Sequence, residues 1–139
     1  MQSVREQIVS ISSLLVGMSM LLIGNSLQGT LIAIRAVGEQ FSASSIGIMT
    51  SGYFLGFVLG TLVTAYLIER AGHIRGFTAL ASLASAAALG HIIILDPIAW
   101  TIFRAISGFC FAGIYMVIES WLNERATNET RGQVLAAYM

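Results

Sequence analysis

One arginine and two amides interrupt long apolar segments of the sequence. Arg104 stands about six positions after the start of its segment, and Asn25 and Gln28 lie three positions apart in another. A charged side chain inside a membrane-spanning helix costs free energy and is therefore a candidate for a functional role. Two simpler interpretations stay open. Arg104 could extend to the outer headgroups, and the amides could hydrogen-bond neighbouring helices, contributing about 0.6 kcal/mol each.

A charged loop is the second group of residues that could do chemistry. Glu69, Arg70 and Arg75 surround Gly72 between two apolar segments. Glu69 falls at the C-terminal end of its expected helix, where the helix dipole disfavours a negative charge. We therefore expect it to pair with a cation or with the N-terminus of another helix, and a carboxylate among guanidinium groups can form charge-assisted hydrogen bonds. The alternative is a charged loop that only sets the topology.

The composition requires lipid around these residues. Of the 139 residues, 56% are apolar and only 10% are charged, and the net charge is +0, whereas soluble domains carry about 25% charged residues. Every positive charge apart from the histidines is an arginine, with no basic run that would suit nucleic acid. Cys110 is the single cysteine, which excludes an intrachain disulfide and a CxxC metal or redox site.

Four apolar stretches are long enough to cross a bilayer core of about 30 Å, which needs about 20 residues. We expect spans at residues 11–34, 46–68, 77–95 and 98–122, and the start of a fifth at 132–139. The expected fold class is an all-α, polytopic membrane helix bundle. Because the fifth segment stops far short of a span, we expect the sequence to be a fragment.

Short connections and local residues indicate where the helices begin. Ser44 or Ser45 is placed to cap the second helix. Asp96 and Pro97 suit the cap and first position of the fourth helix. So tight a turn makes spans three and four antiparallel neighbours.

Arginine positions predict the orientation. With a cytoplasmic N-terminus, five of the seven arginines lie inside, one lies outside and one lies within a span. This distribution satisfies the positive-inside rule. We therefore expect a multi-pass protein of the inner or plasma membrane with its N-terminus in the cytoplasm.

Glycines recur at spacing four in the second span. Gly52, Gly56 and Gly60 fall on one helix face. Small residues let a second helix approach closely, since lipid supplies no hydrophobic drive for helix association. This face is interpreted either as static packing or as a contact at which helices rock.

The charged loop and its position resemble a known family. The signature loop of the major facilitator superfamily, commonly Gly-x-Leu-x-Asp-Arg-x-Gly-Arg-x-Arg, lies between spans two and three. The matching residues are Leu67, Arg70, Gly72 and Arg75. Three positions depart from it, with Ala65 for the first glycine, Glu69 for the aspartate and His73 for the middle arginine.

Two further segments carry the resemblance. Arg104 precedes Gly108 by four positions, which is similar to the fourth-span motif of this superfamily, and Gly108 is a further candidate for helix packing. Residues 119–132 resemble the end of span four and the next loop in a branch called the unknown major facilitator group.

The resemblance implies roles for these residues. Glu69, Arg70, Gly72 and Arg75 would form a cytoplasmic gating loop that latches the two halves of a transporter together. Arg104 would face the cavity, binding anionic groups or assisting proton movement. Since spans one and four line the central cavity in this family, Asn25, Gln28 and Arg104 are predicted to share one polar surface facing the substrate or proton pathway.

The expected function is that of the N-terminal part of a secondary transporter. Residues 1–139 would begin a six-helix bundle that moves a small solute by alternating access. The expected partners are the lipid bilayer, a small-molecule substrate and the remainder of the transporter, without nucleic acid. We expect no cofactor and no metal, with a proton as the candidate coupling ion.

Three other functions are considered. A four-helix small multidrug-type exporter acting as a dimer would be expected to carry a carboxylate in its first span, and residues 8–34 contain none. A tetraspan scaffold explains the spans but not the signature loop or Arg104. We do not expect an enzyme, because no nucleophile–base pair, metal cluster or phosphate loop is recognised.

Overall fold

The computed structural model describes residues 4–126, 128 and 131–138, and these form five helices. Four of them are long and apolar enough to cross a membrane. They are α1 (Val4–Gly38), α2 (Ala43–Ala71), α3 (His73–Ile93) and α4 (Pro97–Arg125), followed by the short α5 (Arg131–Tyr138). The all-α membrane helix bundle expected from the sequence is confirmed.

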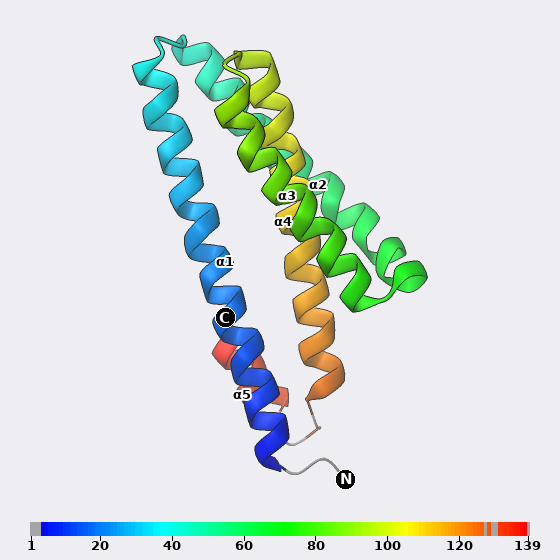
Figure 1. Cartoon of the computed structure of the whole chain (residues 1–139). Helices are drawn as coiled ribbons and strands as arrows, with labels where there is room; N and C mark the ends of the chain where they lie inside the picture. The colour runs from blue at the N-terminus through cyan, green and yellow to red at the C-terminus, as the bar shows by residue number, and fades with distance from the viewer. Residues whose placement is uncertain (1–3, 127, 129–130, 139) are drawn as a thin grey trace.

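The long helices run alternately up and down and are joined by tight connections (Figure 1). All four begin before the expected spans, and α1, α2 and α4 also run past them. For example, α1 has 35 residues, or roughly 50 Å at about 1.5 Å per residue. An apolar core of about 30 Å needs only about 20 of them. Hydropathy marks the part of a helix that suits lipid, whereas the backbone hydrogen bonds continue into the polar ends.

Local capping sets two of the helix starts. The side chain of Ser42, and not that of Ser44 or Ser45, caps α2 by accepting a hydrogen bond of 3.1 Å from the backbone N–H of Ser45. The expected cap of α4 is confirmed, because Asp96 accepts at 2.9 Å from the backbone N–H of Ala99. At the connection between α2 and α3, Gly72 has φ 83° and ψ 170°, a conformation open mainly to glycine.

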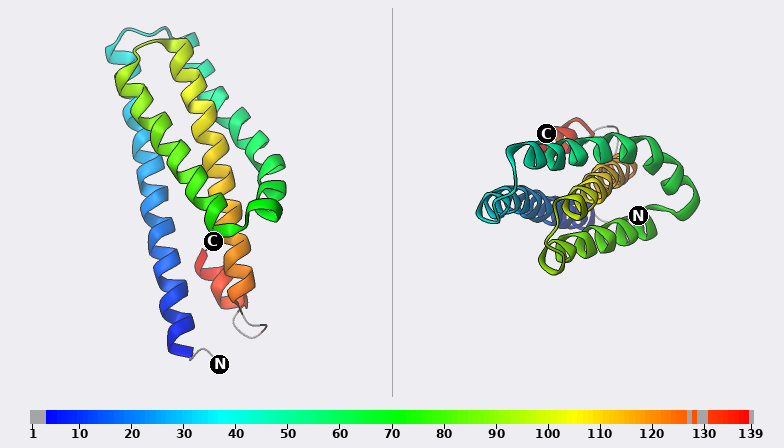
Figure 2. Two further views of the ribbon diagram at one scale, coloured as in Figure 1. Left: turned by 45° about the vertical axis from the view of Figure 1, so that its right-hand side comes forward. Right: turned by 90° about the horizontal axis from the view of Figure 1, so that it is seen from above.

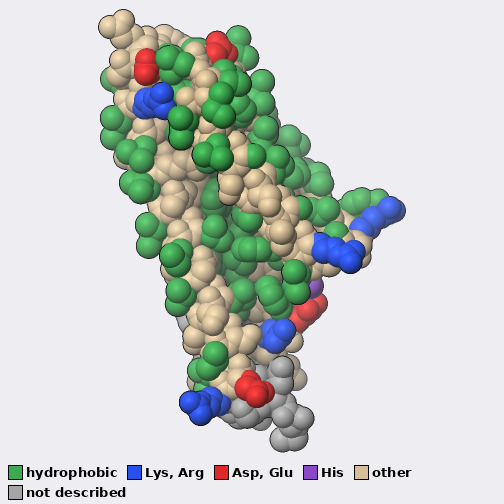
Figure 3. Space-filling view, in the orientation of Figure 1, with side chains coloured by type: hydrophobic (Ala, Val, Ile, Leu, Met, Phe, Trp, Pro, Cys, Tyr) green, Lys and Arg blue, Asp and Glu red, His purple; other side chains and the backbone are tan. Residues whose placement is uncertain are grey.

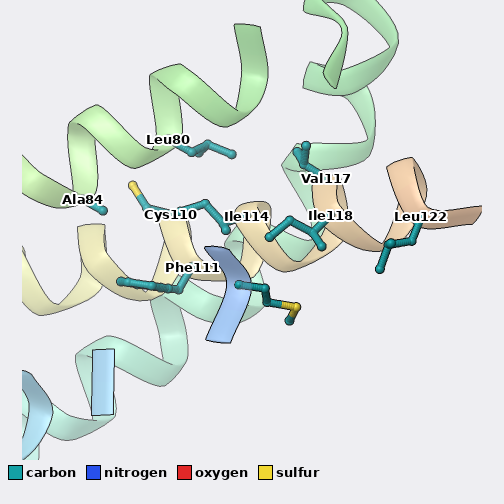
Figure 4. Packing of buried hydrophobic residues seen from close by; sticks show 9 residues of the cluster. Leu80, Ala84, Cys110, Phe111, Ile114, Val117, Ile118 and Leu122 are labelled. Carbon is teal, nitrogen blue, oxygen red and sulfur yellow. The ribbon is translucent and has the colours of Figure 1, made fainter. Parts of the chain in front are cut away.

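Helix α4 is the centre of the bundle. It packs mainly on α2 and α3, whereas α1 contacts it over a shorter stretch. The view from above shows α4 between α2 and α3 (Figure 2). One apolar cluster joins α4 to α3 and α1, with Leu80 and Ala84 facing Cys110 and Ile114 (Figure 4).

A second apolar cluster closes the end that carries the α1–α2 and α3–α4 connections. Ile32 and Ala36 of α1 meet Met49 of α2 and Trp100 of α4, and Trp100 is fully buried. The two clusters hold α1 against the bundle at separate levels.

On the face shown in Figure 3, hydrophobic side chains are spread along the length of the bundle and charged side chains lie toward its two ends. Large apolar side chains such as Leu62 and Ile98 are more than 70% exposed. This arrangement suits a protein whose flanks face hydrocarbon, and the protein is an integral membrane protein.

Candidate functional site

Arg104 lies on α4, about one turn after Trp100, at the level where α1, α2 and α4 meet. The cap at Asp96 and the proline at the first position fix where α4 begins, and so fix the level of Arg104. Its guanidinium carbon lies 4.3 Å from the ring centre of Tyr53 on α2. A Cβ atom on Gly29 of α1 would lie 3.8 Å from Arg104 Nη2. The guanidinium is therefore held between two neighbouring helices.

Tyr53 also joins Asn25 to this arginine. The side-chain amide of Asn25 donates a hydrogen bond of 2.9 Å to the hydroxyl oxygen of Tyr53. Asn25, Tyr53 and Arg104 therefore form one group from three helices, which we call the Arg104 cluster. A cation over an aromatic face is stabilised by about 0.5–2 kcal/mol, most strongly where water is excluded.

Polar atoms in the Arg104 cluster remain available. Asn25 Oδ1 and Arg104 Nη1 are buried and have no hydrogen-bond partner among the described residues. No carboxylate of the described residues lies within ion-pair distance of Arg104. The unpaired guanidinium N–H of Arg104 can bind a group that carries negative charge or accepts hydrogen bonds, whereas Asn25 Oδ1 can accept a hydrogen bond from a donor.

Gln28 lies one turn further along α1 and lines a cavity that includes neither Asn25 nor Arg104. Its neighbours there include His91 of α3 and Trp100 of α4. The structure thus brings Asn25 and Arg104 onto the same tyrosine, whereas Gln28, about 60° round α1 from Asn25, lines a cavity with α3 and α4.

The glycines of α2 and α4 hold the two helices that carry Tyr53 and Arg104. A Cβ atom on Gly56 would overlap the backbone of Ala105, and one on Gly60 would lie 2.5 Å from the carbonyl oxygen of Phe109. Gly52 has more space, because a Cβ atom there would lie 3.1 Å from Thr101 Cγ2. Gly108 faces the other way across the same contact, since its Cβ would overlap the backbone carbonyl of Tyr53. The small residues let the two backbones approach closely.

The charged loop departs from the ion-pair cluster expected for it. Among the described residues, Glu69, Arg70 and Arg75 form no ion pair within 4.0 Å. All three are exposed, and Arg70 instead lies over the ring of Tyr66, 4.7 Å from its centre. Exposed side chains in high dielectric gain little from pairing, which explains why the charges stay apart.

His73 makes polar contacts between the loop and another helix. Its Nε2 atom lies 2.9 Å from the hydroxyl of Ser120 and 3.8 Å from a carboxylate oxygen of Glu124, both on α4. The loop also lines a cavity of about 340 Å³ with Trp121 and Arg125. The contact between the loop and α4 thus passes through a histidine at the position where the signature has an arginine.

Sequence reasoning missed Tyr53 and the contact of His73. Tyr53 stands three residues before Gly56, and helical spacing places it beside the glycine face. A tyrosine next to a face where two helices pack closely was the available signal for a hydroxyl that is partly buried between them. Among the described residues, no three His, Cys, Asp or Glu side chains come together as a metal site would require.

The comparisons with known proteins agree with this architecture. Residues 14–139 match the Major Facilitator Superfamily. Among curated proteins, those described as "Uncharacterized MFS-type transporter YcaD" from Escherichia coli O45:K1 (strain S88 / ExPEC) and O81 (strain ED1a) are each 32% identical over 126 residues. That alignment covers 91% of this chain and 33% of each relative, so the chain spans about a third of their length. No solved structure matches the chain.

A match over most of the chain, on a bundle of four membrane-spanning helices, shows the family. The chain belongs to the Major Facilitator Superfamily.

Proposed function

We propose that this chain forms the first part of the N-terminal bundle of a secondary transporter. In this proposal the transporter moves a small solute across the membrane by alternating access, with a proton as the candidate coupling ion. The coarser statement, that the chain is part of a membrane transporter, follows from its family.

The Arg104 cluster is the observation that carries the proposal. A guanidinium held between three membrane-spanning helices, without a carboxylate among the described residues, is expensive unless a solute, an ion or water meets it. Binding sites of secondary transporters lie within the membrane, between helices. The proposal assigns the pathway to the face of the bundle at which Asn25, Tyr53 and Arg104 meet.

The orientation and the loop belong to the same proposal. With the N-terminus in the cytoplasm, the loop around Gly72 faces the cytoplasm and carries Arg70 and Arg75, in accord with the positive-inside rule. Glu69, Arg70 and Arg75 are exposed and unpaired among the described residues, so they are free to meet a second bundle. The loop would then close the cytoplasmic side as a latch, with His73 anchoring it to α4.

The alternative functions lose their support. A four-helix small multidrug-type exporter or a tetraspan scaffold would not account for a superfamily match across residues 14–139. The close α2–α4 contact also joins Tyr53 to Arg104, which a scaffold would not require.

Cysteine accessibility tests the proposal without knowledge of the solute. In the complete transporter that carries this chain, native cysteines including Cys110 are replaced, and Asn25→Cys is treated with a charged methanethiosulfonate. Alternating access predicts that this thiol is labelled from outside in whole cells and also from inside in inverted vesicles. Leu62→Cys is the matched control, since Leu62 is 71% exposed on the apolar flank of α2. It should react from neither side.

The outcomes separate the alternatives. Labelling of Asn25→Cys from both sides supports a pathway that opens to each face. Labelling from neither side, as for Leu62→Cys, would show that the Arg104 cluster is a packing feature and would overturn the proposal.

A further inference from the structure

A cavity of about 550 Å³ lies between α1, α3 and the start of α4. This volume falls within the range of small-molecule sites, about 300–1,000 Å³. Its walls are mostly apolar, and the side chains that carry polar groups are those of Gln28, Arg35, His91 and Trp100. Leu27, Leu31 and Ile92 are among its apolar lining residues.

His91 supplies an unpaired acceptor in this cavity. Its ring is 4% exposed and packs against the rings of Trp100 and Phe103, with centres 5.5 and 5.3 Å away. Nδ1 lies 2.8 Å from the backbone carbonyl oxygen of Ala87. A carbonyl oxygen only accepts, so Nδ1 carries the hydrogen, and Nε2 of the neutral ring is an acceptor. Nε2 is buried without a partner among the described residues.

Gln28 supplies an unpaired donor on the opposite helix. Its side-chain Nε2 is buried and has no hydrogen-bond partner among the described residues. A polar atom buried without a partner costs about 1–3 kcal/mol. One cavity is therefore lined by a residue of α3 with a free acceptor and a residue of α1 with a free donor.

We propose that this cavity binds a small apolar molecule that carries a hydroxyl group. A hydroxyl donates one hydrogen bond and accepts others, so it can donate to His91 Nε2 and accept from the Gln28 amide. The hydrocarbon part of the molecule packs on Leu27, Leu31, Ile92 and Trp100. Both polar atoms are buried in the structure, so side chains must rotate before the hydroxyl reaches them.

Other occupants satisfy this cavity less well. A lipid acyl chain fits the apolar walls but leaves both polar atoms unpaired. A water molecule pairs them but leaves most of a 550 Å³ apolar volume unfilled. The site does not depend on the transport proposal, because it lies between α1 and α3, away from the contact of Tyr53 with Arg104.

Trp100 is a natural reporter for binding. The chain has two tryptophans, and Trp121 lies at the other end of α4. The complete transporter that carries this chain, with every tryptophan except Trp100 replaced by phenylalanine, is placed in lipid nanodiscs and titrated with cyclohexylmethanol, its methyl ether and methylcyclohexane. The proposal predicts a saturable change in Trp100 emission with the alcohol. The ether accepts but cannot donate, so it should bind about tenfold more weakly, the factor that one lost hydrogen bond of about 1.4 kcal/mol gives.

The two histidines at opposite ends of α3 provide the matched variants. His91→Phe should remove the preference for the alcohol over the ether, whereas His73→Phe, at the far end of α3, should keep it. Gln28→Leu is the second variant, and circular dichroism checks that each variant remains as helical as the parent.

Two results would overturn the inference. Equal affinity for the alcohol, the ether and the hydrocarbon would indicate apolar partitioning alone. No saturable change in Trp100 emission with any probe would mean that water or another segment of protein fills the cavity.

Discussion

Replacing Gly56 by alanine should destabilise the bundle, because the α2–α4 contact has no room for a methyl group. The new Cβ would lie 2.7 Å from the carbonyl carbon of Ala105 and 2.9 Å from its Cα, against about 3.4 Å for the start of ordinary contact. Both atoms belong to the backbone of α4 and cannot rotate away. The helices must therefore separate along a contact whose stability comes from van der Waals packing.

The expected magnitude follows from two opposing effects. Overpacking of a tight contact costs about 1–3 kcal/mol, and the backbone clash at Gly56 favours the upper value. The more restricted unfolded chain of an alanine variant returns about 0.4–1 kcal/mol. We expect Gly56→Ala to lower the free energy of unfolding by about 2 kcal/mol.

Gly47 is the matched control on the same helix. A Cβ atom there would meet nothing within 4 Å, so Gly47→Ala should be neutral or stabilising by up to about 1 kcal/mol. Both variants are unfolded with SDS in mixed micelles, with helicity as the signal. A Gly56→Ala variant as stable as Gly47→Ala would refute the close packing of α2 on α4.

Three further changes test separate parts of the structure. Tyr53→Phe removes the hydroxyl that accepts from Asn25 but keeps the ring under Arg104, so it should lower the free energy of unfolding by about 0.6 kcal/mol in the same assay. Tyr53→Leu removes the ring as well and should lower it further. Asp96→Ala removes the cap of α4 and should lower the free energy of unfolding by about 1 kcal/mol, whereas Asp96→Asn should keep most of the stability because asparagine also caps helices. An equal loss of stability in both variants would argue against capping. Gly72→Ala places a side chain at φ 83° and should cost about 1–3 kcal/mol, and an unchanged midpoint would contradict the positive φ.

The fold could be predicted because hydropathy and helix length are linked directly in a membrane. A span needs about 20 apolar residues whatever it packs against. Local signals also worked where they act on neighbouring residues, as for Asp96 and Pro97. The start of α2 was less certain, because Ser42, Ser44 and Ser45 offer similar hydroxyls and the backbone conformation decides between them.

The candidate site could be predicted only in part, since packing decides which helix faces meet. Asn25 and Arg104 stood out as polar residues in apolar surroundings, and the structure brings both onto Tyr53. Tyr53 did not stand out, because an aromatic residue is common in a membrane span. The separate cavity of Gln28 depends on the position of α3 beside α1, which no local pattern encodes.

The charge of the site is the property that tests the account most directly. Gly29 is the position for the probe, because a Cβ atom there would lie 3.8 Å from Arg104 Nη2 without overlap. Gly29→Cys in the complete, otherwise cysteine-free transporter is labelled with an anionic and a cationic methanethiosulfonate. The ratio of the two rates is then compared between the Arg104 and Arg104→Gln backgrounds, so that the intrinsic difference between the reagents cancels.

An unpaired guanidinium facing an aqueous pathway should favour the anionic reagent. We expect the ratio of anionic to cationic rates to fall about tenfold when Arg104 is replaced by glutamine, which corresponds to about 1.4 kcal/mol of electrostatic attraction. A ratio that does not change, or a thiol at position 29 that neither reagent reaches, would contradict the account.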